Sequence, residues 1–327
     1  MELNLKKVSN REDDTIHTNH LHFKISGNSV NHVIINTLRR IILEELPGFA
    51  YDSDSIKIPE NSSVYNNDYL RNRIENFPVV GLNLKLDMDE YLKLKFDKHN
   101  EDNTETEKQQ EDAELNFSNF NLLNFYLKKE NLSDEILNIT TNDCDFFLKG
   151  KKIENIYKNE LLICKLKKNE KLELSAIVKK GLPMNNAKYS PIGVCCYEEK
   201  SNNDFIFKIE NRNQYKNKEI IIYGCEILIK RLEIILEKIV NKKFSSDNHG
   251  TIILNNENHT LGNLISRGLQ EDSNIEYAAY KLDHLLINDV TIEYITNGSK
   301  TINEIIDKVI KKQIKIFESI KSKIESI

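Results

Sequence analysis

Two histidines in matching settings are the first side chains in this sequence that could carry chemistry. His32 follows Asn31, and His259 follows Asn258, each at the start of an apolar-periodic stretch. A histidine can act as a general base or a metal ligand, but neither is accompanied by a nucleophile motif or by ligand spacing. Polar side chains before a helix can instead bond its free backbone amides. We therefore predict a capping role for both histidines and no catalytic residue.

The five cysteines form no recognisable site. Their number is odd, and no two show C-x-x-C spacing. Adjacent cysteines rarely reach disulfide geometry, so the one neighbouring pair is not a redox centre. The sequence also lacks a phosphate-binding P-loop and a D-x-D-x-D cluster. We expect reduced, mostly buried thiols, no metal and no cofactor; the cysteines are Cys144, Cys164, Cys195, Cys196 and Cys225.

The Asn-His pairs belong to a stretch that occurs twice in the chain. Residues 31–40 reappear as residues 258–267, with Asn, His, Asn and Arg identical at the same steps. A short apolar run precedes each copy, so each predicts a strand, a turn and the first turns of a helix. One repetition is too few for a solenoid, and it indicates a duplicated unit whose copies pack on each other.

A long helix with a regular apolar seam is predicted at the end of each half. Spacings that alternate between four and three residues are typical of a helix that lies along another helix. Two separate surface helices would need only a wider, less regular face, so two regular seams favour a shared core. Gln313 is the polar interruption. The seams are Ile221, Cys225, Leu228, Leu232, Ile235, Ile239 and Ile302, Ile306, Val309, Ile316, Ile320. We expect an internal dimer interface that contains Leu228, Leu232, Ile235, Ile306 and Val309.

The stretch between the two halves has a different composition. Alternating residues such as 171–178 indicate strands. Residues 97–114 are acidic with almost no apolar content, so they cannot offset their ordering entropy, and we predict a disordered surface loop. We also expect a loose tail over residues 1–20 and one strand over residues 49–58. The predicted domains are residues 1–58 with 203–243, a mostly β insert over residues 59–202, and residues 244–327.

Composition excludes some classes of function. The net charge of −5 and a pI near 6.0 argue against a protein that binds nucleic acid over its whole surface. No run approaches the roughly 20 apolar residues that cross a bilayer, and no secretion signal follows Met1. We therefore expect a cytosolic or nuclear protein, or one packaged in a particle, without membrane contact.

Several motifs resemble one family, the α-like subunits of multi-subunit DNA-dependent RNA polymerases. N-T-L-R-R at residues 36–40, followed by E-L-P at 45–47, is similar to a segment of the larger α-like subunit. H-T-L-G-N-L at residues 259–264 resembles the signature of the smaller one. A-K-Y-S-P at 187–191 and R-N-R-I-E-N-F-P at 71–78 look like parts of the larger subunit's insert domain. The resemblance implies that two normally separate subunits are fused here, as in a large cytoplasmic DNA virus.

Some positions depart from the family pattern. Residues 279–286 lack both prolines of the smaller subunit's G-Y-K-x-P-H-P-L run, so the local turn should differ. Asn186 stands where the family often has histidine. Some larger subunits bind zinc or an iron–sulfur cluster through clustered cysteines, and this chain has no such spacing.

The resemblance implies an α+β fold and a non-catalytic role. Two dimerisation units would pack as an intramolecular pseudo-dimer, with helix pairs on antiparallel sheets, and one unit would carry the β insert. Such a platform recruits the largest and second-largest polymerase subunits and small subunits. It meets DNA only through the complex and needs no second copy of itself. Its location would be the cytoplasmic viral factory and the virion if viral, or the nucleus if cellular.

The same resemblance assigns roles to individual residues. Arg39, Arg40 and Lys188 would contact the second-largest subunit, because arginine suits interface ion pairs. His259, Gly262 and Asn263 would form the repeated turn, with Gly262 allowing backbones to approach closely. Ser266 stands where the first copy has Arg39, and this asymmetry would let the two large partners be told apart.

Two other function classes remain as alternatives. The two seams alone would suffice for a stand-alone coiled-coil interaction or regulatory protein. A nucleic-acid-processing enzyme is disfavoured by the charge and by the missing catalytic constellation.

Overall fold

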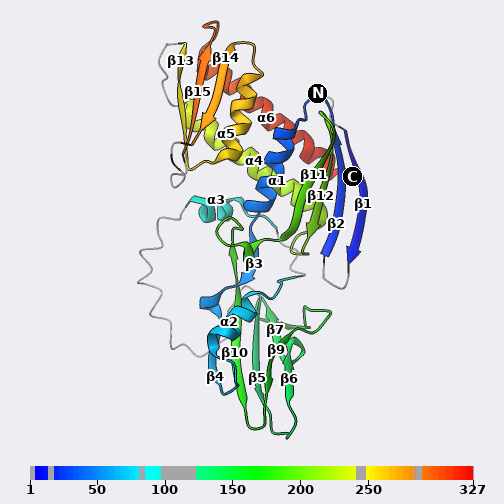
Figure 1. Cartoon of the computed structure of the whole chain (residues 1–327). Helices are drawn as coiled ribbons and strands as arrows, with labels where there is room; N and C mark the ends of the chain where they lie inside the picture. The colour runs from blue at the N-terminus through cyan, green and yellow to red at the C-terminus, as the bar shows by residue number, and fades with distance from the viewer. Residues whose placement is uncertain are drawn as a thin grey trace.

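The computed structural model describes residues 4–13, 18–80, 85–96, 123–240, 248–282, 284 and 289–326. A layer of helices lies between two antiparallel sheets, and an elongated β domain extends from one end of this assembly (Figure 1). The predicted α+β class is confirmed. The acidic residues 97–114 lie outside the described residues, as do residues 241–247 of the linker between the two halves.

The first sheet contains four strands in the order β1-β2-β12-β11. They are β1 (Asn4–Asp13), β2 (Thr18–Ser26), β12 (Asp204–Asn211) and β11 (Ile192–Ser201). Strand β2 buries Leu21, Phe23 and Ile25 in alternation, which is the pattern of a sheet with one face on the core. The predicted loose tail was wrong over β1, which pairs with β2 from Asn4 opposite Ser26 onward.

The second sheet contains three strands in the order β13-β15-β14. They are β13 (His249–Asn255), β15 (Asp289–Thr296) and β14 (Ile275–Lys281). Helix α5 (His259–Gln270) packs on β14 and β15, and α1 (His32–Glu44) packs on β11 of the first sheet. Each copy of the repeat therefore leads from a strand into a helix, as predicted.

The two long helices are α4 (Asn217–Val240) and α6 (Ile302–Glu325), and they pack along each other. All eleven apolar seam residues are buried in one hydrophobic core, which contains residues of both halves of the chain. Burial on α4 is wider than the seam, because Ile220, Ile227 and Arg231 are also buried. The helix is thus covered on more than one side by α6, α1 and their neighbours.

The insert has its own sheet and its own core. Its main sheet has the order β3-β10-β5-β7-β8, with β4 also paired to β10, and β6 and β9 form a separate pair. A second hydrophobic cluster lies beneath these strands. The strands are β3 (Gly48–Tyr51), β4 (Lys57–Asn61), β5 (Asn124–Glu130), β6 (Leu137–Thr140), β7 (Asp145–Leu148), β8 (Lys151–Ile153), β9 (Leu162–Leu166) and β10 (Lys171–Gly181), and the helix is α2 (Asn67–Glu75).

The predicted single strand over residues 49–58 was wrong. A 3-10 turn at Ser53–Ser55 separates β3 from β4, and both strands pair with β10. The insert's sheet therefore begins before residue 59. At the other boundary, β11 lies before residue 202 but belongs to the first sheet, because it pairs with β12.

Helix α3 (Met88–Phe96) lies inside the insert by sequence but not by packing. Its Tyr91 is fully buried in the main core, and Met88, Leu92 and Leu94 pack against that core. Figure 1 shows α3 beside α4 and α5, above the insert's strands. The mostly β insert that we expected over residues 59–202 therefore contains a helical segment that covers the helical layer.

Candidate assembly interface

The repeated turn is built by asparagine and not by histidine. Asn31 Oδ1 accepts a hydrogen bond from the Ile34 amide at 3.0 Å, and Asn258 Oδ1 accepts one from the Thr260 amide at 2.9 Å. Both asparagines are N-caps, which satisfy amides that the helix leaves free. The predicted capping role of the histidines was therefore misplaced by one residue. The His259 ring packs edge-on against Tyr280 instead, with 5.8 Å between centroids.

Gly262 allows α5 to lie close to its sheet. A Cβ at this position would be 2.7 Å from Val290 Cγ1 and 3.0 Å from Tyr280 Cδ2. The close approach is between the helix backbone and strand side chains, where we had expected two backbones. Asn263 is half-buried beside it, and its role remains a prediction.

The residues predicted for the internal interface are buried where α4 meets α6. Leu228, Leu232, Ile235, Ile306 and Val309 are each at most 4% exposed. The polar interruption in the α6 seam has a structural use, because Gln313 Nε2 donates a hydrogen bond to the Leu264 carbonyl at 2.7 Å. At the surface, Lys321 of α6 pairs with Glu226 of α4 at 2.7 Å.

A buried cluster of charges connects elements of both halves. Arg231 of α4 is fully buried, and its guanidinium bonds to Glu45, the C-cap of α1, and to Glu257, just before α5. Helix α3 completes the cluster: the Tyr91 hydroxyl donates to Glu45 at 2.6 Å, and the Lys95 ammonium lies 3.1 Å from the same carboxylate. Four elements that are distant in sequence therefore meet at one charge centre.

The pKa values of the two carboxylates in this cluster shift in opposite directions. Burial alone would raise the pKa of Glu45, yet the charges of Arg231 and Lys95 and the Tyr91 hydroxyl lower it to about 2. Burial raises the pKa of Glu257 above its ordinary value, and Arg231 only partly opposes this. Breaking a buried ion pair by removing one partner leaves an uncompensated charge, which is strongly destabilising. The cluster therefore fixes one arrangement of α1, α3, α4 and the start of α5.

Sequence reasoning missed this cluster. Glu45 was noticed only as part of a motif, and Arg231 stands next to the seam residue Leu232. A charged residue beside a buried seam position was the available signal, because such a residue must find a partner if the seam is covered on both sides. Its partners could not be assigned, since they come from distant segments.

The predicted partner-binding arginines lie together on α1, and both are half-buried. Two nitrogens of Arg40 donate to the Glu44 carboxylate at 3.0 and 3.1 Å. Arg39 Nε donates to Asn36 Oδ1 at 3.0 Å. A guanidinium carries five N–H donors, so these contacts orient both groups and leave donors for a partner.

Lys188 lies elsewhere, where the insert meets the helical layer. Its ammonium is 2.6 Å from Asp52 and 2.8 Å from Glu75, and its side chain is only 16% exposed. Burial would lower the pKa of this ammonium, but the two carboxylates raise it above the ordinary value. Its neighbour Tyr189 packs over Gly181, where a Cβ would be 2.7 Å from the ring. The predicted contact of Lys188 with a partner subunit remains a prediction.

The described residues lack two kinds of feature. They contain no group of three or more His, Cys, Asp or Glu side chains placed to share one metal ion. No helix in the described part of the chain combines the length and apolarity needed to cross a bilayer.

Comparison with known proteins identifies the family. A profile described as the RNA polymerase Rpb3/Rpb11 dimerisation domain matches residues 22–232, and a second profile with the same description matches residues 249–323. The chain belongs to this family. It carries two such domains in one polypeptide, and the first match extends across the insert.

Individual relatives agree with this assignment. Protein R470 of Acanthamoeba polyphaga mimivirus, provisionally named a DNA directed RNA polymerase subunit, is 27% identical over 90% of this chain and 85% of its own length. Subunit 3B of Arabidopsis thaliana RNA polymerases IV and V is 24% identical over 57% of this chain and 55% of its own. Subunit Rpo11 of Sulfolobus acidocaldarius RNA polymerase is 36% identical over 20% of this chain and 71% of its own. The fusion of larger and smaller α-like units is thus shared along nearly its whole length with a viral protein.

Proposed function

We propose that this chain is the non-catalytic platform on which a DNA-directed RNA polymerase assembles its two large subunits. Its membership of the Rpb3/Rpb11 family supports a role as an assembly subunit. The observation that carries the proposal is the single core shared by α1, α4, α5 and α6, to which both halves contribute. One chain therefore supplies what two subunits otherwise form by dimerisation, and no second copy is needed.

Specific surfaces are assigned to specific partners in this proposal. Arg39 and Arg40 contact the second-largest subunit, because their guanidiniums are oriented by Asn36 and Glu44 and keep free donors. The second copy of the repeat serves the internal interface or the largest subunit, and small subunits complete the platform. DNA is reached only through the complex. The similarity to the mimivirus protein supports a location in a cytoplasmic viral factory and in the virion.

Co-expression with the two large polymerase subunits of the same source tests the platform. We expect a complex of the three chains on size-exclusion chromatography with light scattering, and a monomer when this chain is expressed alone. A stable homodimer, or no complex, would instead favour the stand-alone interaction protein.

A double variant tests the arginine contact. Arg39→Ala with Arg40→Ala should leave the circular dichroism spectrum unchanged and weaken capture of the second-largest subunit at least about tenfold, since charged interface pairs contribute roughly 2 kcal/mol or more when truncated. Lys230→Ala, which removes an exposed cation from α4 outside both proposed binding sites, is the control and should not weaken that capture. Unfolding of the double variant would show that the arginines are structural.

A further inference from the structure

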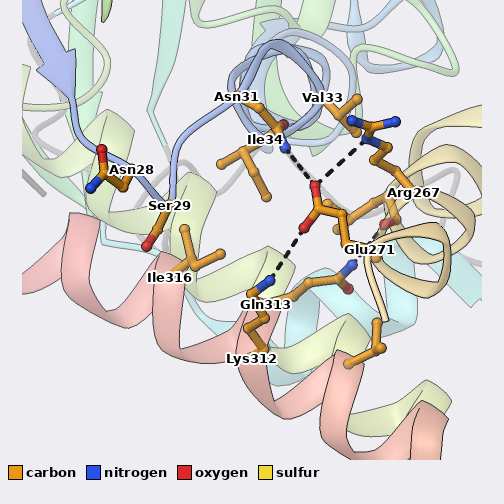
Figure 2. Close-up of a pocket in the computed structure, with 13 residues that line it drawn as sticks. Asn28, Ser29, Asn31, Val33, Ile34, Arg267, Glu271, Lys312, Gln313 and Ile316 are labelled. Atoms are coloured by element: carbon orange, nitrogen blue, oxygen red, sulfur yellow. Dashed lines mark hydrogen bonds and ion pairs between the residues drawn. The ribbon is translucent and has the colours of Figure 1, made fainter. Parts of the chain in front are cut away.

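A pocket of about 130 Å³ lies at the end of the helical layer opposite the buried charge cluster. Figure 2 shows that it lies between the N-terminal end of α1, the C-terminal end of α5 and one face of α6. Glu271 accepts a hydrogen bond from Asn31 at 3.4 Å and pairs with Lys312 at 3.2 Å and with Arg267 at 3.6 Å. The apolar wall includes Ile34, Val309 and Ile316.

One polar atom at this pocket has no partner. Gln313 lines the pocket and is only 4% exposed, and its Nε2 donates to the Leu264 carbonyl. Its Oε1 is buried and accepts no hydrogen bond from any described residue. An unsatisfied buried acceptor destabilises the fold, and most buried polar groups in native structures have a hydrogen-bond partner, so this acceptor indicates a missing donor.

The other end of the helical layer shows how an equivalent site is filled. In the seams, Leu232 of α4 corresponds to Gln313 of α6, so Arg231 corresponds to Lys312. Both ends combine the C-terminal end of one repeat helix with the start of the other. At the α4 end, Tyr91 of α3 is fully buried and its hydroxyl donates to Glu45.

Among the described residues, none fills the α6 end as Tyr91 fills the α4 end. All 13 tyrosines of the sequence lie within the described ranges, and none of them lines the pocket. Gly268 lines the pocket and stands where the first copy has Ile41; it lets α5 lie close to α6, because a Cβ there would be 2.5 Å from Gln313 Nε2 and Val309 Cγ1. A cavity of about 150 Å³ can hold a benzene ring, so the pocket suits one aromatic side chain.

We propose that this pocket binds a tyrosine side chain from another subunit of the polymerase. The ring packs against Ile34, Val309 and Ile316, and the hydroxyl donates to Gln313 Oε1. Arg267 and Lys312 lie at the rim of the pocket, where their cationic groups can make cation–π interactions with the face of the ring. The chemistry of the pocket is independent of the proposed function, but the identity of the partner rests on it.

The isolated full chain tests the chemistry, with p-cresol as the tyrosine side-chain probe and toluene as the matched probe without a hydroxyl. Methyl NMR should show saturable shifts at Ile34, Val309 and Ile316, with p-cresol bound about fivefold more tightly than toluene, since one hydrogen bond contributes about 1 kcal/mol. Gln313→Leu should reduce that ratio to about one, and it should fold because leucine is the residue at the equivalent position 232. Absence of shifts, or equal affinities in the unsubstituted chain, would overturn the proposal.

The co-expressed complex tests the partner. A photo-crosslinking residue, p-benzoylphenylalanine, replaces exposed Asn28 at the pocket, and the control replaces Lys230 on α4. We expect the Asn28 crosslink next to a tyrosine of another polymerase subunit, with a yield that Gln313→Leu lowers. A complex whose Asn28 crosslinks reach no tyrosine-bearing segment would refute the partner assignment and leave the proposed function intact. If no complex forms, the proposed function and the partner assignment are both refuted. The p-cresol titration then still tests the chemistry of the pocket.

Discussion

The two carboxylates that share Arg231 should respond differently when each is neutralised. Glu45→Gln should lower the free energy of unfolding by about 3 kcal/mol at pH 7, because the fold lowers the pKa of Glu45 from 4.5 to about 2 and each pKa unit corresponds to about 1.4 kcal/mol. Glu257→Gln should lower the free energy of unfolding by less than Glu45→Gln does. The fold raises the pKa of Glu257, so folding disfavours its charged form relative to the unfolded chain, and an amide oxygen can still accept from Arg231.

The pH dependence follows from the direction of each shift. A lowered pKa stabilises the fold above the unfolded value, here about 4.5, and that stabilisation is lost as the pH falls towards about 2. The difference between the unsubstituted chain and Glu45→Gln should therefore shrink by more than half at about pH 3. A raised pKa acts in the opposite direction, so any stabilisation from Glu257 is present at low pH and is lost as the pH rises through its folded-state pKa.

Urea unfolding followed by far-UV circular dichroism at both pH values measures these differences. Glu44→Gln is a matched control one residue away, because Glu44 is 37% exposed and pairs with Arg40, and exposed pairs contribute at most about 1 kcal/mol. Equal losses for Glu45→Gln and Glu257→Gln would refute the unequal roles. A Glu45→Gln effect of the same size at pH 7 and pH 3 would refute the assignment of the stabilisation to a charged carboxylate.

Two further outcomes are expected. Lys188→Met leaves the carboxylates of Asp52 and Glu75 without their shared cation, so it should lower the free energy of unfolding, measured in urea, by about 1–2 kcal/mol. Unchanged stability would show that Lys188 has no structural role and would leave partner binding as its function. Cys196 should be the only thiol that reacts quickly with Ellman's reagent in the folded chain, because the other four cysteines are buried and burial raises the pKa of each thiol. A second fast thiol would contradict that packing.

Elements with strong local patterns could be predicted from the sequence. The alternation from Leu21 to Ile25 and the seams of α4 and α6 reflect burial on one face, which is a property of neighbouring residues. The asparagine before each repeat helix was also visible, although the capping bond was assigned to the adjacent histidine. Such signals locate strands and helices because the residues that form each pattern are neighbours within one helical turn or one strand.

Features set by distant partners could not be predicted. Strand β1 is polar, and its pairing with β2 comes from backbone bonds that leave no apolar pattern. Helix α3 could not be placed on the core from its own sequence, since the site it covers is made by Glu45 and Arg231. The boundary near residue 202 was placed too late for the same reason, because the partner of β11 becomes clear only when β12 is paired to it.

The two ends of the helical layer differ, so they can bind different partners even though the chain is built from two similar units. α1 and α5 lie beside each other in opposite directions, because Asn31 meets Glu271 at one end while Glu45 and Glu257 share Arg231 at the other.

In a dimer of identical units both ends would be the same. Here α3 covers one end, where Arg231 is fully buried and its Nε has no hydrogen-bond partner among the described residues, whereas the other end has a pocket, a buried acceptor without a described partner and the exposed Lys312. We therefore expect a partner that inserts a side chain to bind at the end with the pocket. The asymmetry that we first placed between Arg39 and Ser266 is weaker, because Ser266 is buried and presents nothing to a partner. The difference between the buried Arg231 and the exposed Lys312 distinguishes the two ends of the helical layer more directly.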